Sequence, residues 1–123
     1  MVKRICIPGA RKIFVDVNGN FYPCEKVGEA NQFIIGRYDK GLEYRKVIDL
    51  IDKYISMCED CKSCWAMRLC GLCFASARKG SELSRERKKE RCTGTKSRLH
   101  NSLVMYASIM EKNPEAFKFL RQW

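Results

Sequence analysis

A chain of 123 residues has the length of one domain, or of a part excised from a longer protein. Its 24 Lys and Arg residues outnumber its 14 Asp and Glu residues, and the net charge of +10 favours an anionic partner such as nucleic acid, a membrane surface or an acidic peptide. The sequence has no signal peptide and no apolar run of the roughly 18 residues that cross a bilayer, so we expect a cytoplasmic protein without a membrane segment. Disulfides persist mainly in oxidising compartments, and the eight cysteines are therefore expected to be reduced.

The N-terminal part of the chain predicts a β-hairpin. Residues 12–17 alternate apolar and polar side chains, as a half-buried strand does, and apolar residues resume after Asn18-Gly19. Asn-Gly favours a type I′ turn, because both central residues of that turn need a positive φ. The second strand ends just before Cys24, so the hairpin is expected to hold this cysteine in a fixed position.

Two further elements are expected before the cysteines concentrate. Residues 33–36 form a short apolar run that ends at a glycine, which indicates a third strand or an extended segment. Residues 42–55 have the period of an amphipathic helix that covers the hairpin. The apolar face expected to join the core consists of Tyr44, Val47, Ile48, Ile51 and Ile55.

Residues 58–73, the cysteine-rich segment, contain five of the eight cysteines: Cys58, Cys61, Cys64, Cys70 and Cys73. Thiolates are soft ligands that favour zinc, iron or iron–sulfur clusters, and a C-x2-C turn lets two thiolates face one centre. The segment therefore predicts a metal centre. Trp65 within it either shields a cluster from water or fills a small core. A modest core that depends on metal should unfold in large part when the metal is removed.

The C-terminal third is basic and helical in pattern. In residues 78–98, acidic residues recur every fourth position among many basic ones, which indicates a solvated helical or mobile segment or a docking surface for an acidic peptide. Cys92 lies near its end, and residues 93–95 predict a turn. Two helices are expected over about residues 97–122, the second beginning near Pro114. The whole pattern predicts an α+β fold in a single domain, residues 1–123.

Taken together, the cysteines resemble the pattern of a SPASM domain, the C-terminal extension of radical S-adenosylmethionine (SAM) enzymes that mature ribosomally made peptides. The family pattern has a cysteine, a G-x4-C motif on a hairpin, C-x2-C-x5-C-x3-C, and a last cysteine. In this chain the corresponding residues are Cys6, Gly19-x4-Cys24, Cys61-x2-Cys64-x5-Cys70-x2-Cys73 and Cys92. The chain differs in having two residues between Cys70 and Cys73 where the family usually has three, and Cys58 is additional to the pattern.

This resemblance implies two auxiliary [4Fe–4S] clusters. Carried over by position, the ligands of the first cluster would be Cys6, Cys24 and Cys73. The ligands of the second cluster would be Cys61, Cys64, Cys70 and Cys92. The first cluster then has three protein ligands, so either Cys58 supplies the fourth or the site is open to a peptide substrate or another group. The implied role is substrate binding and electron transfer in an enzyme that forms a thioether or a related cross-link in a peptide.

The chain lacks the parts that would cleave SAM. It has no C-x3-C-x2-C loop, in which three cysteines leave one iron free for SAM, and no βα alternation of a barrel. We therefore expect no activity from this chain alone and predict no catalytic residue in it. The implied partners are a radical SAM barrel domain, in cis or in trans, to which SAM would bind, and a precursor peptide.

A zinc-binding module is the alternative from a different class. Two four-cysteine Zn²⁺ sites and a basic surface for nucleic acid would suit the paired C-x2-C spacing and the pI near 9.4. The G-x4-C motif on a hairpin and the x5 interval are not typical of zinc ribbons. A nucleophilic cysteine enzyme has less support, because no motif links His100, the only histidine, to a thiol.

Overall fold

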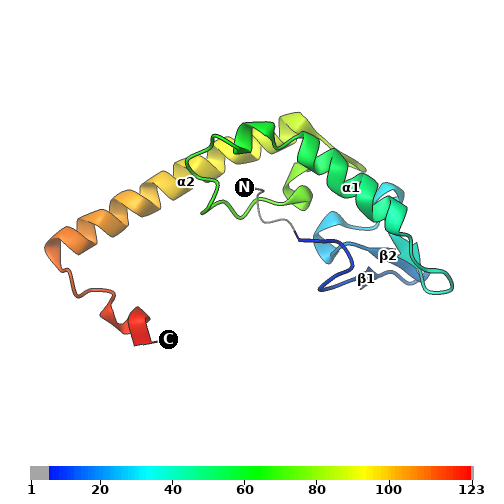
Figure 1. Ribbon diagram of the computed structural model, residues 1–123, viewed down its shortest axis with the longest axis horizontal. Helices are drawn as coiled ribbons and strands as arrows, with labels where there is room; N and C mark the ends of the chain where they lie inside the picture. The colour runs from blue at the N-terminus through cyan, green and yellow to red at the C-terminus, as the bar shows by residue number, and fades with distance from the viewer. Residues whose placement is uncertain (1–5, 123) are drawn as a thin grey trace.

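The computed structural model describes residues 6–122 and shows the α+β fold that the sequence predicts. A four-stranded antiparallel sheet is followed by helix α1 (Tyr44–Ser56), and a two-stranded hairpin is followed by helix α2 (Arg85–Lys112). Figure 1 shows the sheet and α1 at one end of the molecule and α2 extending away from them toward the C-terminus. The predicted single domain also includes residues 1–5 and Trp123, which lie outside the described residues.

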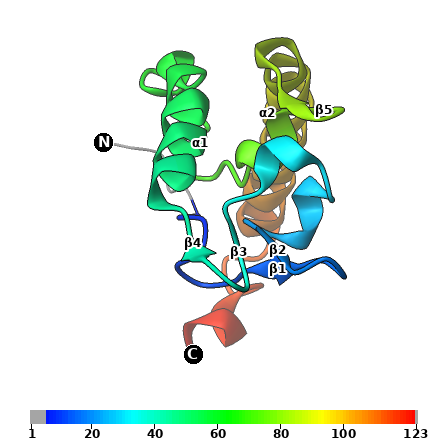
Figure 2. The same ribbon diagram turned by 90° about the vertical axis from the view of Figure 1, so that its right-hand side faces the viewer.

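All strands are short, and those of the larger sheet are paired in chain order, β1-β2-β3-β4. Their bounds are Phe14–Val15, Asn20–Tyr22, Gly36–Arg37 and Gly41–Leu42. The smaller hairpin consists of β5 (Arg78–Lys79) and β6 (Glu82–Leu83). The third strand lies at the end of the predicted run 33–36, because residues Asn31–Phe33 form a 3-10 helix instead. Helix α1 begins two residues after β4 and rises from the sheet (Figure 2).

The predicted hairpin is confirmed, but its turn is not of type I′. Gly19 has a φ of 78°, whereas no non-glycine residue among those described has a positive φ. Asn18 therefore does not adopt the conformation that a type I′ turn requires. The Gly19 N–H donates to the Asp16 carbonyl oxygen at 3.0 Å, so the turn spans residues 16–19. A glycine in the left-handed region then leads into β2, as in a three-residue hairpin loop.

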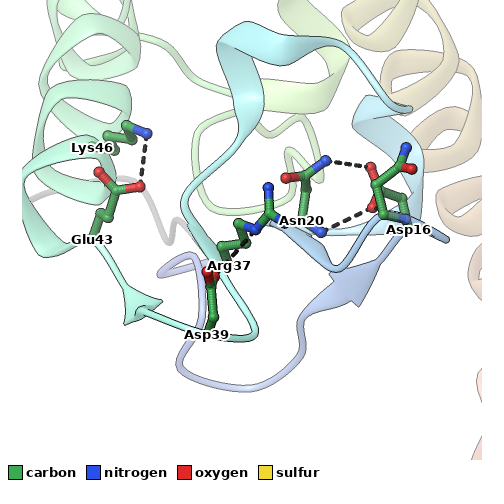
Figure 3. Close-up of polar contacts among 7 residues, drawn as sticks. Asp16, Asn20, Arg37, Asp39, Glu43 and Lys46 are labelled. Carbon is green, nitrogen blue, oxygen red and sulfur yellow. Dashed lines mark hydrogen bonds and ion pairs between the residues drawn. The ribbon is translucent and has the colours of Figure 1, made fainter.

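The Asp16 carboxylate explains why this turn is preferred. Its oxygens accept hydrogen bonds from the Asn18 and Asn20 N–H groups, the Asn20 side-chain amide and the Tyr22 hydroxyl, at 2.9 to 3.0 Å. Figure 3 shows the carboxylate facing the Asn20 amide. Burial raises the pKa of Asp16, but these hydrogen bonds lower it by more. The net pKa therefore lies below its ordinary value.

We expect Asp16→Asn to lower the melting temperature by a few degrees at pH 7, because an amide cannot accept all four of these hydrogen bonds. The lowered pKa keeps Asp16 ionised above its unfolded value of about 3.9, so the difference from the unchanged protein should be the same at pH 5 as at pH 7. Thermal unfolding followed by circular dichroism measures it. The matched control is Asp39→Asn, which removes an exposed ion pair with Arg37 (Figure 3) and should have little effect. A difference that disappears at pH 5 would contradict the lowered pKa.

Helix α1 is confirmed, but the prediction of its buried face is partly wrong. The buried side chains are Val47, Leu50 and Tyr54, whereas Tyr44, Ile48 and Ile55 are exposed. Apolar residues make up more than half of this helix. Their spacing therefore could not show which of them face the core and which lie at the exposed border of the apolar face. The core joins side chains from β2, the segment between β2 and β3, and α1. Its most deeply buried large members are Tyr22, Val27, Phe33, Ile35 and Tyr54.

Helix α2 is continuous through the predicted turn at residues 93–95, and that prediction is wrong. A single glycine costs a helix interior only about 1 kcal/mol, and the preceding run 85–91 consists entirely of Arg, Lys and Glu, which are good helix formers. The Ser84 Oγ caps the helix start by accepting the Arg87 N–H at 3.3 Å. The second C-terminal helix is a turn followed by the short 3-10 helix Lys118–Gln122. No helix within residues 6–122 is long and apolar enough to span a membrane.

Candidate metal centre

The cysteine-rich segment folds as a series of tight turns after α1. The Cys61 N–H donates to the Cys58 carbonyl oxygen at 2.9 Å, and the Cys64 N–H donates to the Cys61 carbonyl oxygen at 3.2 Å. Each of these two C-x2-C steps is therefore closed by one hydrogen bond, which brings its two cysteines close in space. Only Ala66 is buried between residues 62 and 73, so this part of the segment adds little to the core.

Four cysteines line one hollow, the four-cysteine hollow, between the cysteine-rich segment and α2. They are Cys61, Cys64, Cys70 and Cys92. Ala66 and Met67 from the segment and Thr95 and Lys96 from α2 complete its lining. Cys92, Thr95 and Lys96 are three and four residues apart, so they lie on one face of α2.

The other three predicted ligands line a second hollow, the three-cysteine hollow. They are Cys6, Cys24 and Cys73. Cys24 is buried two residues after the end of β2, as the hairpin prediction requires, and Cys73 precedes the 3-10 helix Phe74–Ala77. The Ser76 N–H donates to the Cys73 carbonyl oxygen at 2.9 Å and the Cys73 N–H donates to the Ser76 Oγ at 3.4 Å, which fixes the backbone at Cys73. The hollow has a volume of about 340 Å³, and basic residues, Arg11, Lys12 and Lys26, lie around it.

Cys58 lines neither hollow. It is buried at the end of α1 among core residues, close to Tyr54. Burial is the largest cause that raises the pKa of Tyr54, and the negative charge that Cys58 carries as a thiolate is the second. His100 is exposed on α2 and also lines neither hollow. The three cysteines that the resemblance assigns to the first cluster therefore line one hollow, the four that it assigns to the second line another, and Cys58 lies in the core.

The arrangement of the thiols bears on whether a single zinc ion or an iron–sulfur cluster could bind. Among residues 6–122, no three Cys, His, Asp or Glu side chains converge closely enough to hold a single metal ion. A tetrahedral zinc site needs Zn–S distances of about 2.3 Å and hence thiolates within about 4 Å of one another. The cysteines of each set line a common hollow without meeting at one point, and their soft thiol donors suit iron–sulfur clusters as well as zinc.

The four-cysteine hollow itself is narrow. Its volume is about 20 Å³, about that of a single water site, so a cluster requires the lining segment to move outward. The segment can do so at small cost, because Trp65 and Leu69 are already 55% and 54% exposed. Trp65 therefore neither fills the core nor shields the hollow in this arrangement; Ala66 and Met67 line it instead.

Sequence reasoning missed one residue of this centre, Lys88. The basic segment was expected to be solvated or a docking surface, yet Lys88 is only 4% exposed, and its Nζ donates to the Cys61 Sγ at 3.5 Å. Burial lowers the pKa of Lys88, but the negative charges of Cys61, Cys58 and Cys92 raise it more, so the net pKa lies above its ordinary value. The sequence did contain one signal for this position. Lys88 precedes Cys92 by four residues, so in a helix the two side chains lie on the same face.

Comparisons with protein families, with curated proteins and with solved structures found no match to this chain. No residue role is therefore carried over from a relative. The functional assignment rests on the cysteine spacing and on the geometry of the two hollows.

Proposed function

We propose that this chain is an auxiliary iron–sulfur domain of the SPASM type that holds two [4Fe–4S] clusters in a radical SAM enzyme modifying a ribosomal peptide. One observation carries the proposal. The resemblance implies a set of three and a set of four cysteines, and each set lines a hollow of its own with no cysteine shared between them. This division does not follow from sequence order, because Cys73 lines the hollow of the distant Cys6 and Cys24 and not that of its sequence neighbours Cys61, Cys64 and Cys70.

The residues of the four-cysteine hollow suit an electron-carrying centre. A bound [4Fe–4S] cluster carries single electrons at a potential set by its net charge, its hydrogen bonds and its exposure to solvent. Met67 and Ala66 supply an apolar lining, and Cys92 is presented by a rigid helix. These residues would hold the cluster, limit the access of water and fix one ligand in place.

The three-cysteine hollow suits a centre that a substrate approaches. It has three thiols and a volume of about 340 Å³, so a further group has room to enter. Arg11, Lys12 and Lys26 around it favour a negatively charged group, such as an acidic stretch of a precursor peptide. Lys12 is already paired with Glu25 at 3.0 Å, which leaves Arg11 and Lys26 as the cations better placed to meet such a group.

A zinc-binding module with a nucleic-acid partner is the second candidate. The small volume of the four-cysteine hollow favours it, because a single ion needs less space than a cluster of eight iron and sulfide atoms. The larger three-cysteine hollow is harder to explain this way, since a closed structural zinc site needs four ligands around one ion.

Metal analysis after anaerobic purification tests the proposal. We expect a brown protein with about eight irons and eight sulfides per chain, as two four-iron clusters require. Iron, sulfide and zinc would be quantified beside the visible spectrum, before and after cluster reconstitution. A colourless protein with about two zincs and no sulfide even after reconstitution would overturn the proposal in favour of the zinc module.

A further inference from the structure

Lys88 is a buried cation that contacts Cys61, one of the residues lining the four-cysteine hollow. It belongs to the most basic stretch of the chain, where its neighbours Arg85, Glu86, Lys89 and Glu90 are all exposed. A buried ammonium group is unfavourable unless it is paired or hydrogen-bonded. No ion pair between Lys88 and a carboxylate is found within residues 6–122, and its Nζ donates instead to the Cys61 Sγ at 3.5 Å.

The same helix face carries both this donor and a predicted ligand. Lys88, Cys92 and Thr95 are separated by four and three residues, and they are the inward-facing positions of the first half of α2. The Ser84 cap sets where α2 begins, and the Lys88 N–H continues the helix by donating to the Ser84 carbonyl oxygen at 3.1 Å. The position of Lys88 relative to Cys92 is therefore fixed by the backbone of α2.

We propose that Lys88 is a positioning residue that holds Cys61 as a cluster ligand and raises the reduction potential of the four-cysteine centre. This inference rests on the proposed function. A hydrogen bond from a cation to a ligand sulfur withdraws negative charge from the cluster, which favours the reduced, more negative state. Because Lys88 is buried, salt screens this interaction much less than it would at the surface.

The test compares Lys88→Met with Lys89→Met in the full chain. Methionine keeps an unbranched apolar stem but lacks the ammonium group, and Lys89 is the adjacent exposed lysine with the same charge. In redox titrations followed by electron paramagnetic resonance, Lys88→Met should shift the reduction equilibrium of one cluster at least tenfold toward the oxidised form. For one electron, this is a potential lower by about 60 mV. The other cluster, and both clusters of Lys89→Met, should keep their potentials.

The variant Lys88→Arg distinguishes an effect of the positive charge from an effect of side-chain packing, because it keeps the charge and changes the shape. If Lys88→Met loses the four irons of this centre, retention of these irons in Lys88→Arg supports the role of the cation in holding Cys61. Loss in both variants would overturn the inference, because the charge would then not be what matters. Unchanged potentials in a Lys88→Met protein that retains both clusters would also overturn it, while leaving the proposed function intact. An unchanged protein without iron and sulfide after reconstitution would instead overturn the proposed function, and this inference with it.

Discussion

Cys92→Ala should lower the iron and sulfide content from about eight of each to about four of each per chain. Cys92 is the one cysteine of its set that comes from α2, and its thiol lines only the four-cysteine hollow. Without it the proposed cluster at this hollow would lose a ligand, whereas Cys6, Cys24 and Cys73 remain around the other hollow. Iron and sulfide assays with the visible spectrum measure the change.

The matched variant is Cys24→Ala, which should remove the other four irons and leave the four-cysteine centre loaded. The double variant should be colourless. If either single variant lost all the iron, or if neither lost any, the division into two separate centres would be wrong.

Cys58→Ala is the control that decides the fourth ligand of the first cluster. Because Cys58 lines neither hollow, we expect this variant to retain about eight irons, with three thiols and an open position at the three-cysteine centre. The variant should instead lower the free energy of unfolding, because Cys58 is buried in the core. Loss of about four irons would show instead that Cys58 completes that centre.

The sequence predicted the elements whose signals are local. The hairpin, α1 and the position of Cys24 after the second strand all followed from apolar period and turn residues. The turn type did not follow, because the Asp16 carboxylate organises the turn through bonds to residues as far along as Tyr22. The continuity of α2 through Gly94 was also missed, because Thr93-Gly94-Thr95 is locally unfavourable to a helix and the helix-forming run 85–91 before it outweighs that local preference.

Long-range contacts that local sequence signals cannot predict matter even more at the candidate site. Spacing and family resemblance grouped the cysteines, but neither could show that Cys58 lies in the core or that Trp65 is exposed. Lys88 was hidden within a run of charges, which usually lies in solvent. Its burial depends on α2 passing beside the cysteine-rich segment, and only the tertiary structure reveals that contact.

If the two proposed clusters are bound, removing them should unfold the cysteine-rich segment and release the first half of α2. Between residues 62 and 73 the segment buries only Ala66, and α2 carries just two buried residues, Lys88 and Thr95, both beside the hollow or its ligands. Little apolar burial remains to hold these parts when the metal–thiolate bonds are lost, and such bonds can contribute about 10 kcal/mol or more in small metal-dependent domains.

Amide hydrogen exchange measures this directly. Protection should be lost in residues 58–73 and 85–96 after chelation, while the core around Tyr22, Phe33 and Tyr54 should exchange more slowly than these segments. Cys24→Ala is the matched control: it should empty only the three-cysteine centre and so leave residues 85–96 protected. Unchanged protection in the metal-free protein would mean that packing alone holds α2 in place, and that the cysteines are not needed for this part of the fold.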